Sequence, residues 1–345
     1  MGRILSTDRL VDALVKLGRQ LREPDEQLSQ LIESAHQYNG WFISKNVRQA
    51  ISSIVDMLSW EDLTHWLSLQ KGKTASTQEA KKIGLILAGN IPIVGFHDIL
   101  CVLVSGHRAL IKMSSQDQQL IPYIFQKLIE IEPAFKEQVE YIDRLKEFDA
   151  VIATGSNNTS RYFEYYFKNV PHIIRKNRNS IAVFTGDETA ADLMQIGHDI
   201  FDYFGLGCRS VSKLYVPTGY DFKLFFEAIE QFKWVIDQSK YTNNYDYNKS
   251  IFLVNGDKHL DNGFLLLKPS ESFQSPLATL YYEEYTNVQA LEKKLEPHSD
   301  QIQCIVTSIP MKLNTQQVHF GDSQKPKLWD YADGVDTMCF LSGLY

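Results

Sequence analysis

The chain has 345 residues, of which 44% are hydrophobic and 22% are charged, and its formal net charge at pH 7 is −7. This length is too great for one ordinary hydrophobic core and indicates two domains, while the composition is typical of a soluble globular protein. The acidic balance argues against nucleic acid or an anionic membrane as the main partner.

The chain contains four widely spaced cysteines without a CxxC pair: Cys101, Cys208, Cys304 and Cys339. This spacing favours reduced thiols over a disulfide framework or a zinc site. Charged residues interrupt the apolar face of the N-terminal segment, so we do not expect a signal peptide. No apolar run approaches the ~20 residues that span a bilayer. We therefore expect a cytoplasmic protein without a membrane span or a metal centre.

Residues 1–70 are predicted to be helical, because apolar residues return every three or four positions, and a polar loop follows over 70–82. The predicted strands of the next part are 83–88, 108–113 and 149–155, and further apolar runs cover 171–177 and 180–186. The predicted helices are 93–106, 117–131, one that begins at 156, and 188–204. Buried strands that alternate with helices indicate βαβ units and a parallel sheet.

The same alternation repeats more loosely after Cys208. Predicted helices cover 220–232 and 287–295, and apolar runs of strand length cover 212–217, 250–255, 263–269, 278–285 and 302–308. The segment 321–345 is rich in aromatic residues and carboxylates, with Asp330, Asp333 and Asp336 close together. We expect this arm to pack against the sheet or a neighbouring subunit rather than to bind a metal.

Polar residues follow the predicted strands of the first half, although the chain has no GxGxxG turn. Asn90 follows the first strand, Lys112 ends the second and precedes Ser114, and Gly155 and Ser156 open a helix after the third. A cation and a hydroxyl suit a ribose or a phosphate, and N-terminal helix amides suit a pyrophosphate. Ordinary helix capping and a solvated lysine remain open as alternatives.

Cys208 lies between an apolar aromatic helix and a strand, in the sequence GLGCRS. The glycines let the backbone bend closely around the sulfur. Composition alone leaves two interpretations open, a nucleophile in a built site or a small apolar residue at the end of a helix.

The segments GNIP, GHRALIKMSS, ATGS and GCRSVSKLYV resemble, in order and approximate spacing, the aldehyde dehydrogenase superfamily. LAGNIP and QKPKLWDYADGVDTMCFL carry a closer resemblance to the LuxC branch, the acyl-CoA reductases that form fatty aldehyde. The resemblance covers about residues 80–345. It implies an α/β aldehyde-dehydrogenase-like fold, with two Rossmann-like α/β domains and a helical N-terminal segment.

The resemblance also implies a division of the chain into functional parts. Residues 1–80 would form a helical segment that packs on the nucleotide domain, and 81–205 an NAD(P)-binding domain. Residues 206–320 would form the catalytic domain that carries the nucleophilic cysteine, and 321–345 a C-terminal arm. A homo-oligomer, and an acyl-protein synthetase as a partner, are further expectations from the family.

The family's site residues map onto this chain one by one. Cys208 matches the nucleophile, which forms an acyl-enzyme thioester as CoA leaves, and Asn90 matches the oxyanion-hole asparagine. Lys112 matches the lysine that contacts the adenosine ribose. Ser114 follows without an adjacent acidic residue, which favours NADPH over NADH. Gly155 and Ser156 match the turn beside the pyrophosphate, and Glu271 matches the glutamate that holds the nicotinamide ribose.

One departure from the superfamily affects the predicted reaction. Where hydrolytic members have a glutamate that activates water, the stretch IIRKNRNSIAVF has Arg175, Lys176 and Arg178 but no carboxylate. Without that base the acyl-enzyme is expected to be reduced rather than hydrolysed. The prediction is therefore NADPH-dependent reduction of a long-chain acyl-CoA to fatty aldehyde. The alternatives are an NAD-dependent aldehyde dehydrogenase and a non-reducing cysteine acyl-carrier or acyltransferase module.

Overall fold

The computed structural model describes residues 5–70 and 79–344. Residues 71–78, within the predicted loop 70–82, lie outside that description. The chain divides into two compact units, the first made of Met1–Asn177 with Pro326–Tyr345 and the second of Arg178–Lys325. Each unit is built around its own sheet, as predicted for an α/β protein with two Rossmann-like domains.

The first unit contains a five-stranded sheet in the order β3-β2-β1-β4-β5, in which all neighbours are parallel. Its strands are β1 (Lys82–Ile86), β2 (Arg108–Lys112), β3 (Val139–Tyr141), β4 (Ala150–Thr154) and β5 (His172–Arg175). The strand order reverses between β1 and β4, where doubly wound sheets bind their ligands. The three strands predicted from apolar runs are all present, whereas the short, polar β3 gave no such signal.

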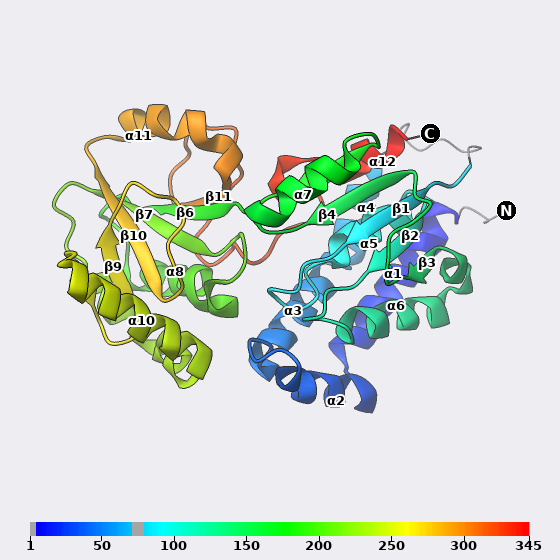
Figure 1. Cartoon of the computed structure of the whole chain (residues 1–345), viewed down its shortest axis with the longest axis horizontal. Coiled ribbons are helices and arrows are strands. Elements are labelled where there is room, and N and C mark those ends of the chain that lie inside the picture. Colours follow the sequence, from blue (N-terminus) through cyan, green and yellow to red (C-terminus); the bar gives the residue numbers. More distant parts are fainter. Residues whose placement is uncertain (1–4, 71–78, 345) are drawn as a thin grey trace. The chain divides into compact units, whose positions relative to one another are not determined.

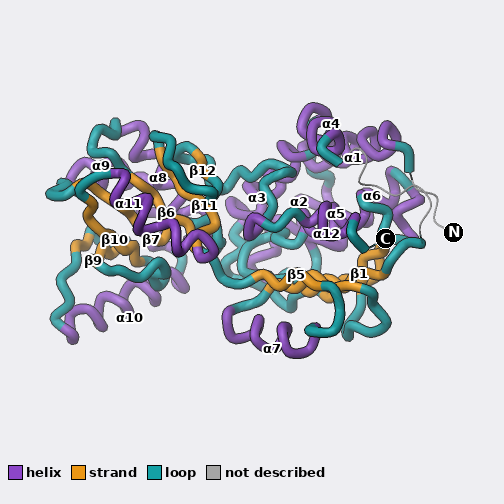
Figure 2. Tube along the Cα trace, turned by 90° about the horizontal axis from the view of Figure 1, so that it is seen from above, coloured by secondary structure: helices purple, strands orange, loops and turns teal. Residues whose placement is uncertain are grey.

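Helices cover both faces of this sheet, with α7 on one side and α5 and α12 on the other (Figure 2). The helices of the first unit are α1 (Thr7–Arg22), α2 (Glu26–Ser34), α3 (Ser44–Met57), α4 (Trp60–Ser68), α5 (Phe96–Val104), α6 (Leu120–Ile131), α7 (Asn157–Phe167) and α12 (Thr337–Ser342). Helix α1 packs against α3 and α6. Its Leu14 and Leu17 are completely buried, so the N-terminal helices share the core of this unit.

The C-terminal segment, residues 326–345, is anchored in the first unit by polar contacts. The buried Arg175 pairs with Asp98 at 2.6 Å and also donates to the carbonyl of Ala332 and the hydroxyl of Thr337. The Trp66 indole donates to the hydroxyl of Tyr331. Within the described residues no group of acidic, histidine or cysteine side chains could hold a metal. The polar contacts pack this segment against β5 and the helices α4 and α5 of its own unit.

The second unit contains a seven-stranded sheet in the order β12-β11-β6-β7-β10-β9-β8, parallel except for β8 against β9. Figure 1 labels its strands β11, β6, β7, β10 and β9. Its strands are β6 (Asn179–Val183), β7 (Val211–Pro217), β8 (Leu260–Asp261), β9 (Leu266–Pro269), β10 (Thr279–Tyr285), β11 (Ile302–Thr307) and β12 (Gln317–Val318). Its helices are α8 (Ala190–Phe201), α9 (Lys223–Ile229), α10 (Ser239–Asn255) and α11 (Val288–Leu295). Leu291 and Leu295 of α11 pack on Ile181, Tyr215 and Ile305 of the sheet.

Two details differ from the sequence-based expectation. Strand β6 and helix α8, which a boundary at 205/206 assigned to the nucleotide domain, lie in the second unit because β6 pairs with β7 and β11.

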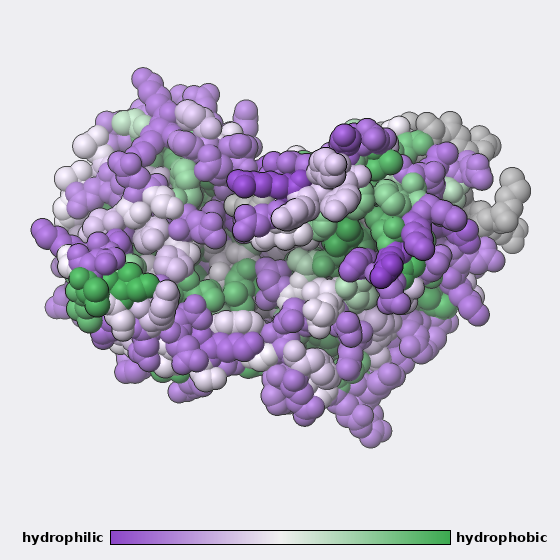
Figure 3. Space-filling view, viewed as in Figure 1, coloured by the Kyte–Doolittle hydropathy of each residue, from purple (hydrophilic) through white to green (hydrophobic). Residues whose placement is uncertain are grey.

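The apolar run 250–255 is the end of α10, which the left-handed Gly256 terminates. Leu253 and Val254 are 62% and 87% exposed there and contribute to an apolar surface over α10 (Figure 3). None of the described helices is long and apolar enough to cross a membrane.

Candidate functional site

The segment before Cys208 has an unusual backbone. Helix α8 ends at Phe201, and the next residues include Tyr203, Phe204 and Gly205 with φ of 54°, 58° and 76°. A bulky residue at positive φ is a conformational outlier, and such strain costs about 1–3 kcal/mol per residue. Both aromatic side chains are buried, and their packing offsets that cost. The three left-handed residues end the helix abruptly and direct the chain into the turn that carries Cys208.

Cys208 itself is exposed at the amino-terminal edge of the second sheet, just before β7. It belongs to a turn, Gly207–Ser210, which we call the Cys208 turn, closed by a 3.0 Å hydrogen bond from the Ser210 N–H to the Gly207 carbonyl. The Ser180 hydroxyl donates to the Cys208 carbonyl at 3.0 Å. The flanking Arg209 and Ser210 are buried, so the turn presents the cysteine on an otherwise packed segment. A reactive thiolate requires such exposure.

The other cysteines differ in their surroundings. Cys101 and Cys304 are completely buried, and burial raises the pKa of both thiols, that of Cys304 to about 11. Cys339 is exposed at the start of α12, in the first unit. Cys208 is thus the exposed cysteine of the second unit. A nucleophilic cysteine in the predicted catalytic domain would need this exposure to reach its substrate.

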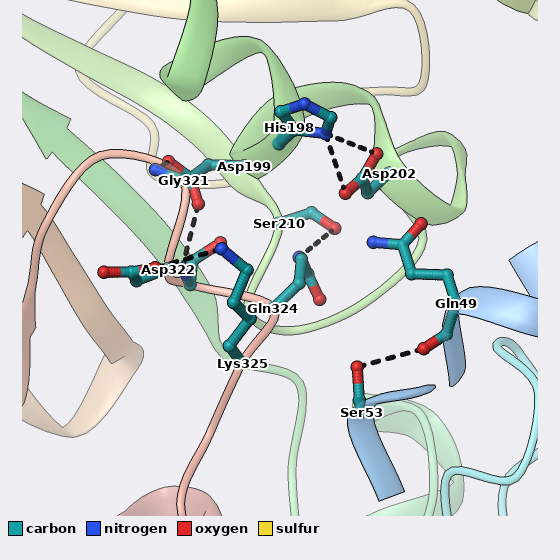
Figure 4. A network of polar contacts seen from close by, with 11 residues as sticks. Gln49, Ser53, His198, Asp199, Asp202, Ser210, Gly321, Asp322, Gln324 and Lys325 are labelled. Atoms are coloured by element: carbon teal, nitrogen blue, oxygen red, sulfur yellow. Dashed lines mark hydrogen bonds and ion pairs between the residues drawn. The ribbon is translucent and has the colours of Figure 1, made fainter. Parts of the chain in front are cut away.

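A polar network holds the segment 321–324 beside the Cys208 turn (Figure 4). The Asp199 carboxylate is completely buried and accepts the backbone N–H groups of Gly321 at 2.6 Å and Ser323 at 2.9 Å. The Gln324 amide then donates to the Ser210 hydroxyl at 3.2 Å. Burial raises the pKa of Asp199 to about 6. Sequence reasoning missed this network, although a carboxylate among the apolar residues of helix 188–204 was a visible signal.

Glu271, the predicted ribose-binding glutamate, has an exposed side chain on a firmly anchored backbone. Its carbonyl accepts a 2.9 Å hydrogen bond from Lys213 Nζ, which also pairs with Glu283 at 2.8 Å. Lys213 is fully buried, and burial lowers the pKa of its amine. The Ser212 hydroxyl donates to the carbonyl of Phe273 in the same loop at 2.7 Å. The loop that contains Glu271 and Phe273 is therefore attached to the beginning of β7. The Cys208 turn is attached to the beginning of β6.

In the first unit, the loops after β1 and β2 lie against one another. A Cβ atom on Gly89 would lie 2.5 Å from the Ser114 hydroxyl, so only glycine permits this approach. Asn90 follows directly with an exposed side chain, and Lys112 is exposed at the end of β2. The structure thus brings Asn90, Lys112 and Ser114 to one edge of the sheet, as the parallel arrangement predicted.

Two buried polar side chains hold the loop of Asn90. The Asn39 amide donates to the Gly89 carbonyl at 3.2 Å, and the Asp117 carboxylate accepts the Ile93 N–H at 2.8 Å. Ile93 has φ of 60°, an outlier for a β-branched residue. Burial raises the pKa of Asp117 to about 6. A carboxylate buried without a cation is costly, and here it stabilises a strained loop beside a predicted site residue.

Gly155 and Ser156 lie at the end of β4, next to β1, where the strand order of the first sheet reverses. Ser156 is the N-cap of α7, and its hydroxyl accepts the Thr159 N–H at 3.3 Å. A Cβ on Gly155 would lie 3.0 Å from both Phe163 and Thr159, so glycine keeps the first turn of α7 close to the strand. Ser156 thus caps α7, and the N-terminus of this helix lies at the edge of the sheet where the strand order reverses.

Comparison with known proteins gives a consistent result. The model of the acyl-CoA reductase (LuxC) family matches residues 19–225, more than half of the chain. Comparison with curated protein sequences found no match. Similar solved structures include aldehyde dehydrogenase 21 from Physcomitrella patens, with a TM-score of 0.68, 11% identity, and coverage of 99% of this chain and 84% of that one.

Two further structures contain NAD+. Betaine aldehyde dehydrogenase from Staphylococcus aureus has a TM-score of 0.61 at 11% identity, over 91% of this chain and 75% of its own. An aldehyde dehydrogenase from Bacillus cereus has a TM-score of 0.60 at 12% identity, over 91% and 76%. These likenesses confirm the predicted aldehyde-dehydrogenase-like fold.

Proposed function

Because the chain belongs to the LuxC acyl-CoA reductase family, an oxidoreductase family, we propose that it reduces a long-chain acyl-CoA to fatty aldehyde with NADPH, through an acyl-enzyme on Cys208. The observation that carries this proposal is the exposed Cys208 in a turn that follows the strained, buried residues Tyr203 and Phe204. Strain of this kind persists only where the surroundings enforce it, and it is concentrated at functional sites.

In the first half-reaction, the Cys208 thiolate attacks the thioester carbonyl, a new C–S bond forms, and CoA leaves as its thiolate. The backbone N–H of Cys208 and the amide of Asn90 are the proposed donors to the oxyanion. Loss of one such donor typically lowers the rate by ~10²–10³. The Asn39 and Asp117 contacts support this role, because they fix the backbone on both sides of Asn90.

The proposed cofactor contacts are Lys112, Ser114, Gly155, Ser156 and Glu271. Two glycines that allow close backbone approach support them, since the loop after β1 and the first turn of α7 both exclude a Cβ atom. Without an adjacent carboxylate, the exposed Lys112 and the neighbouring Ser114 suit a ribose 2′-phosphate, which favours NADPH over NADH. When bound, NADPH supplies the hydride that converts the acyl-enzyme to aldehyde.

The surroundings of Arg175 support reduction over hydrolysis. In this stretch of the chain Arg175 is buried and engaged by Asp98, and Lys176 pairs with Glu164 at 2.6 Å. The stretch supplies no carboxylate of its own at the position where hydrolytic relatives activate water. Because carboxylates engage Arg175 and Lys176, we do not propose that these two cations contact the phosphates of CoA.

The test is the intact mass of the protein mixed with long-chain acyl-CoA without nucleotide, beside Cys208→Ala. We expect an acyl adduct that the variant lacks and that NADPH discharges as aldehyde. An adduct that NADPH leaves untouched would favour the acyl-carrier or acyltransferase alternative. Absence of an adduct at every chain length would refute acyl-CoA as donor, and an acylated partner protein, as from an acyl-protein synthetase, would be tested next.

A further inference from the structure

The second sheet is irregular at the start of β6, next to the Cys208 turn. On one side, Ile302 of β11 pairs with Asn179 of β6, but the next pair is Ile305 with Ile181. A step of three residues in β11 therefore matches a step of two in β6. On the other side, Val211 of β7 pairs with Ser180, but the next pair is Lys213 with Ile181. A step of two residues in β7 therefore matches a step of one in β6. Bulges are rare between parallel strands, and they redirect side chains and often lie beside active sites. Here they flank Ser180 on both sides.

At this irregularity the Ser180 hydroxyl lies between two groups. Its Oγ is 3.0 Å from the Cys208 carbonyl oxygen and 3.1 Å from the Cys304 Sγ. Ser180 and Cys304 are both completely buried, so bulk water does not complete their hydrogen bonding.

The chemistry of the three groups fixes the direction of both hydrogen bonds. A carbonyl oxygen can only accept, so the Ser180 proton goes to Cys208. Ser180 Oγ must then accept the S–H of Cys304. Burial raises the pKa of that thiol to about 11, so Cys304 retains its proton at neutral pH. Cys304, which composition assigns to core packing, is therefore a hydrogen-bond donor.

We propose that Cys304 and Ser180 form a hydrogen-bonded relay that holds the Cys208 peptide in the orientation its nucleophilic role requires. Both are positioning residues, and the inference rests on the function proposed above. Ser180 attaches to the Cys208–Arg209 peptide, and the turn's own hydrogen bond joins Ser210 to Gly207. Loss of the relay frees that peptide to rotate, which turns the thiolate away from the line of attack while leaving it exposed.

The first experiment measures single-turnover acylation by acyl-CoA. Ser180→Ala and Cys304→Ala should each slow acylation by about threefold to tenfold, the range expected for one hydrogen bond. Cys304→Ser should restore the rate, because its hydroxyl can donate to Ser180. Cys101→Ala, which removes an equally buried thiol from α5, is the matched control and should leave the rate unchanged.

Two comparisons separate positioning from a structural role. The Ser180→Ala/Cys304→Ala double variant should be no slower than Ser180→Ala, because Cys304 acts only through Ser180. Alkylation of Cys208 by iodoacetamide, followed by peptide mass mapping, should be unchanged in every variant, since this small reagent needs exposure but no fixed direction. Additive losses, or equal losses in acylation and alkylation, would overturn the relay.

Hydrogen exchange of a peptide spanning residues 206–211 tests the relay without acyl-CoA. Exchange should be faster in Ser180→Ala and Cys304→Ala and return to the wild-type rate in Cys304→Ser. Unchanged exchange overturns the relay whether or not acylation occurs. If the wild type forms no acyl adduct, the proposed function fails, and exchange alone decides whether the relay exists. Faster exchange with normal acylation would refute the positioning role.

Discussion

Replacing the buried carboxylate of Asp117 by an amide should stabilise the first unit at neutral pH. Burial raises the pKa of Asp117 from 3.8 to about 6, so the folded state holds its proton more tightly than the unfolded state. The carboxylate therefore lowers stability above the folded pKa, and this penalty disappears as the pH falls through the folded pKa towards the unfolded value. A difference of ~2 pKa units corresponds to about 3 kcal/mol at about pH 8 and to roughly half of that at about pH 5.

Asp117→Asn keeps the shape of the side chain and an oxygen that can accept the Ile93 N–H. We expect its stability advantage over the wild type to fall by roughly half between about pH 8 and about pH 5. Urea unfolding followed by tryptophan fluorescence measures this difference. Four of the five tryptophans, Trp41, Trp60, Trp66 and Trp329, belong to the first unit and report mainly on it.

The matched control is Asp56→Asn, which removes the same charge from an exposed position of α3. Its stability difference from the wild type should be small and the same at both pH values. If Asp117→Asn is destabilised equally at both pH values, ionisation of Asp117 does not lower the free energy of unfolding. That result would refute the reasoning from burial.

Three further substitutions test other contacts. Arg175→Met should cost about 3–5 kcal/mol, because it leaves the largely buried Asp98 carboxylate without its cation, and should expose the C-terminal segment to limited proteolysis. Gly89→Ala should lower stability by about 1–3 kcal/mol by overpacking and weaken NADPH binding measured by fluorescence titration; unaltered binding would remove this loop from the cofactor site. Lys213→Met should weaken NADPH binding about fivefold through the backbone of Glu271 while acylation of Cys208 proceeds normally, and a parallel loss of acylation would contradict this.

Patterns in the sequence predicted the elements with the strongest periodicity. The strands at 83–88, 108–113 and 149–155 are apolar because helices cover both faces, and this signal needs no knowledge of the partner strands. The boundary of the second unit was not visible in the same way. Strand β6 resembles the preceding strands in composition, and only its pairing with β7 and β11 assigns it to the second sheet.

The candidate site was predictable to the extent that its residues follow strands or carry a family motif. Exposed side chains such as Asn90, Lys112 and Cys208 fall into this class. The buried residues around the site were missed, because Asp199, Lys213 and Ser180 bond backbone groups of Gly321, Glu271 and Cys208 that are distant in the sequence. Nothing in the local sequence distinguishes a buried serine that orients a peptide from one that merely fills a strand.

The division of the chain has a consequence for the order of assembly during synthesis. The second unit is continuous, from Arg178 to Lys325, whereas the first requires both Met1–Asn177 and Pro326–Tyr345. The Trp66 indole finds its Tyr331 acceptor only in the last part of the chain, and so does the Arg175 donor that bonds the Ala332 carbonyl. A ribosome therefore delivers the whole second unit before the first can close. Until then, the Trp66 indole and one donor of the Arg175 guanidinium lack these acceptors. During synthesis, the first unit therefore remains incomplete for longer than the second and is the more exposed of the two to misfolding.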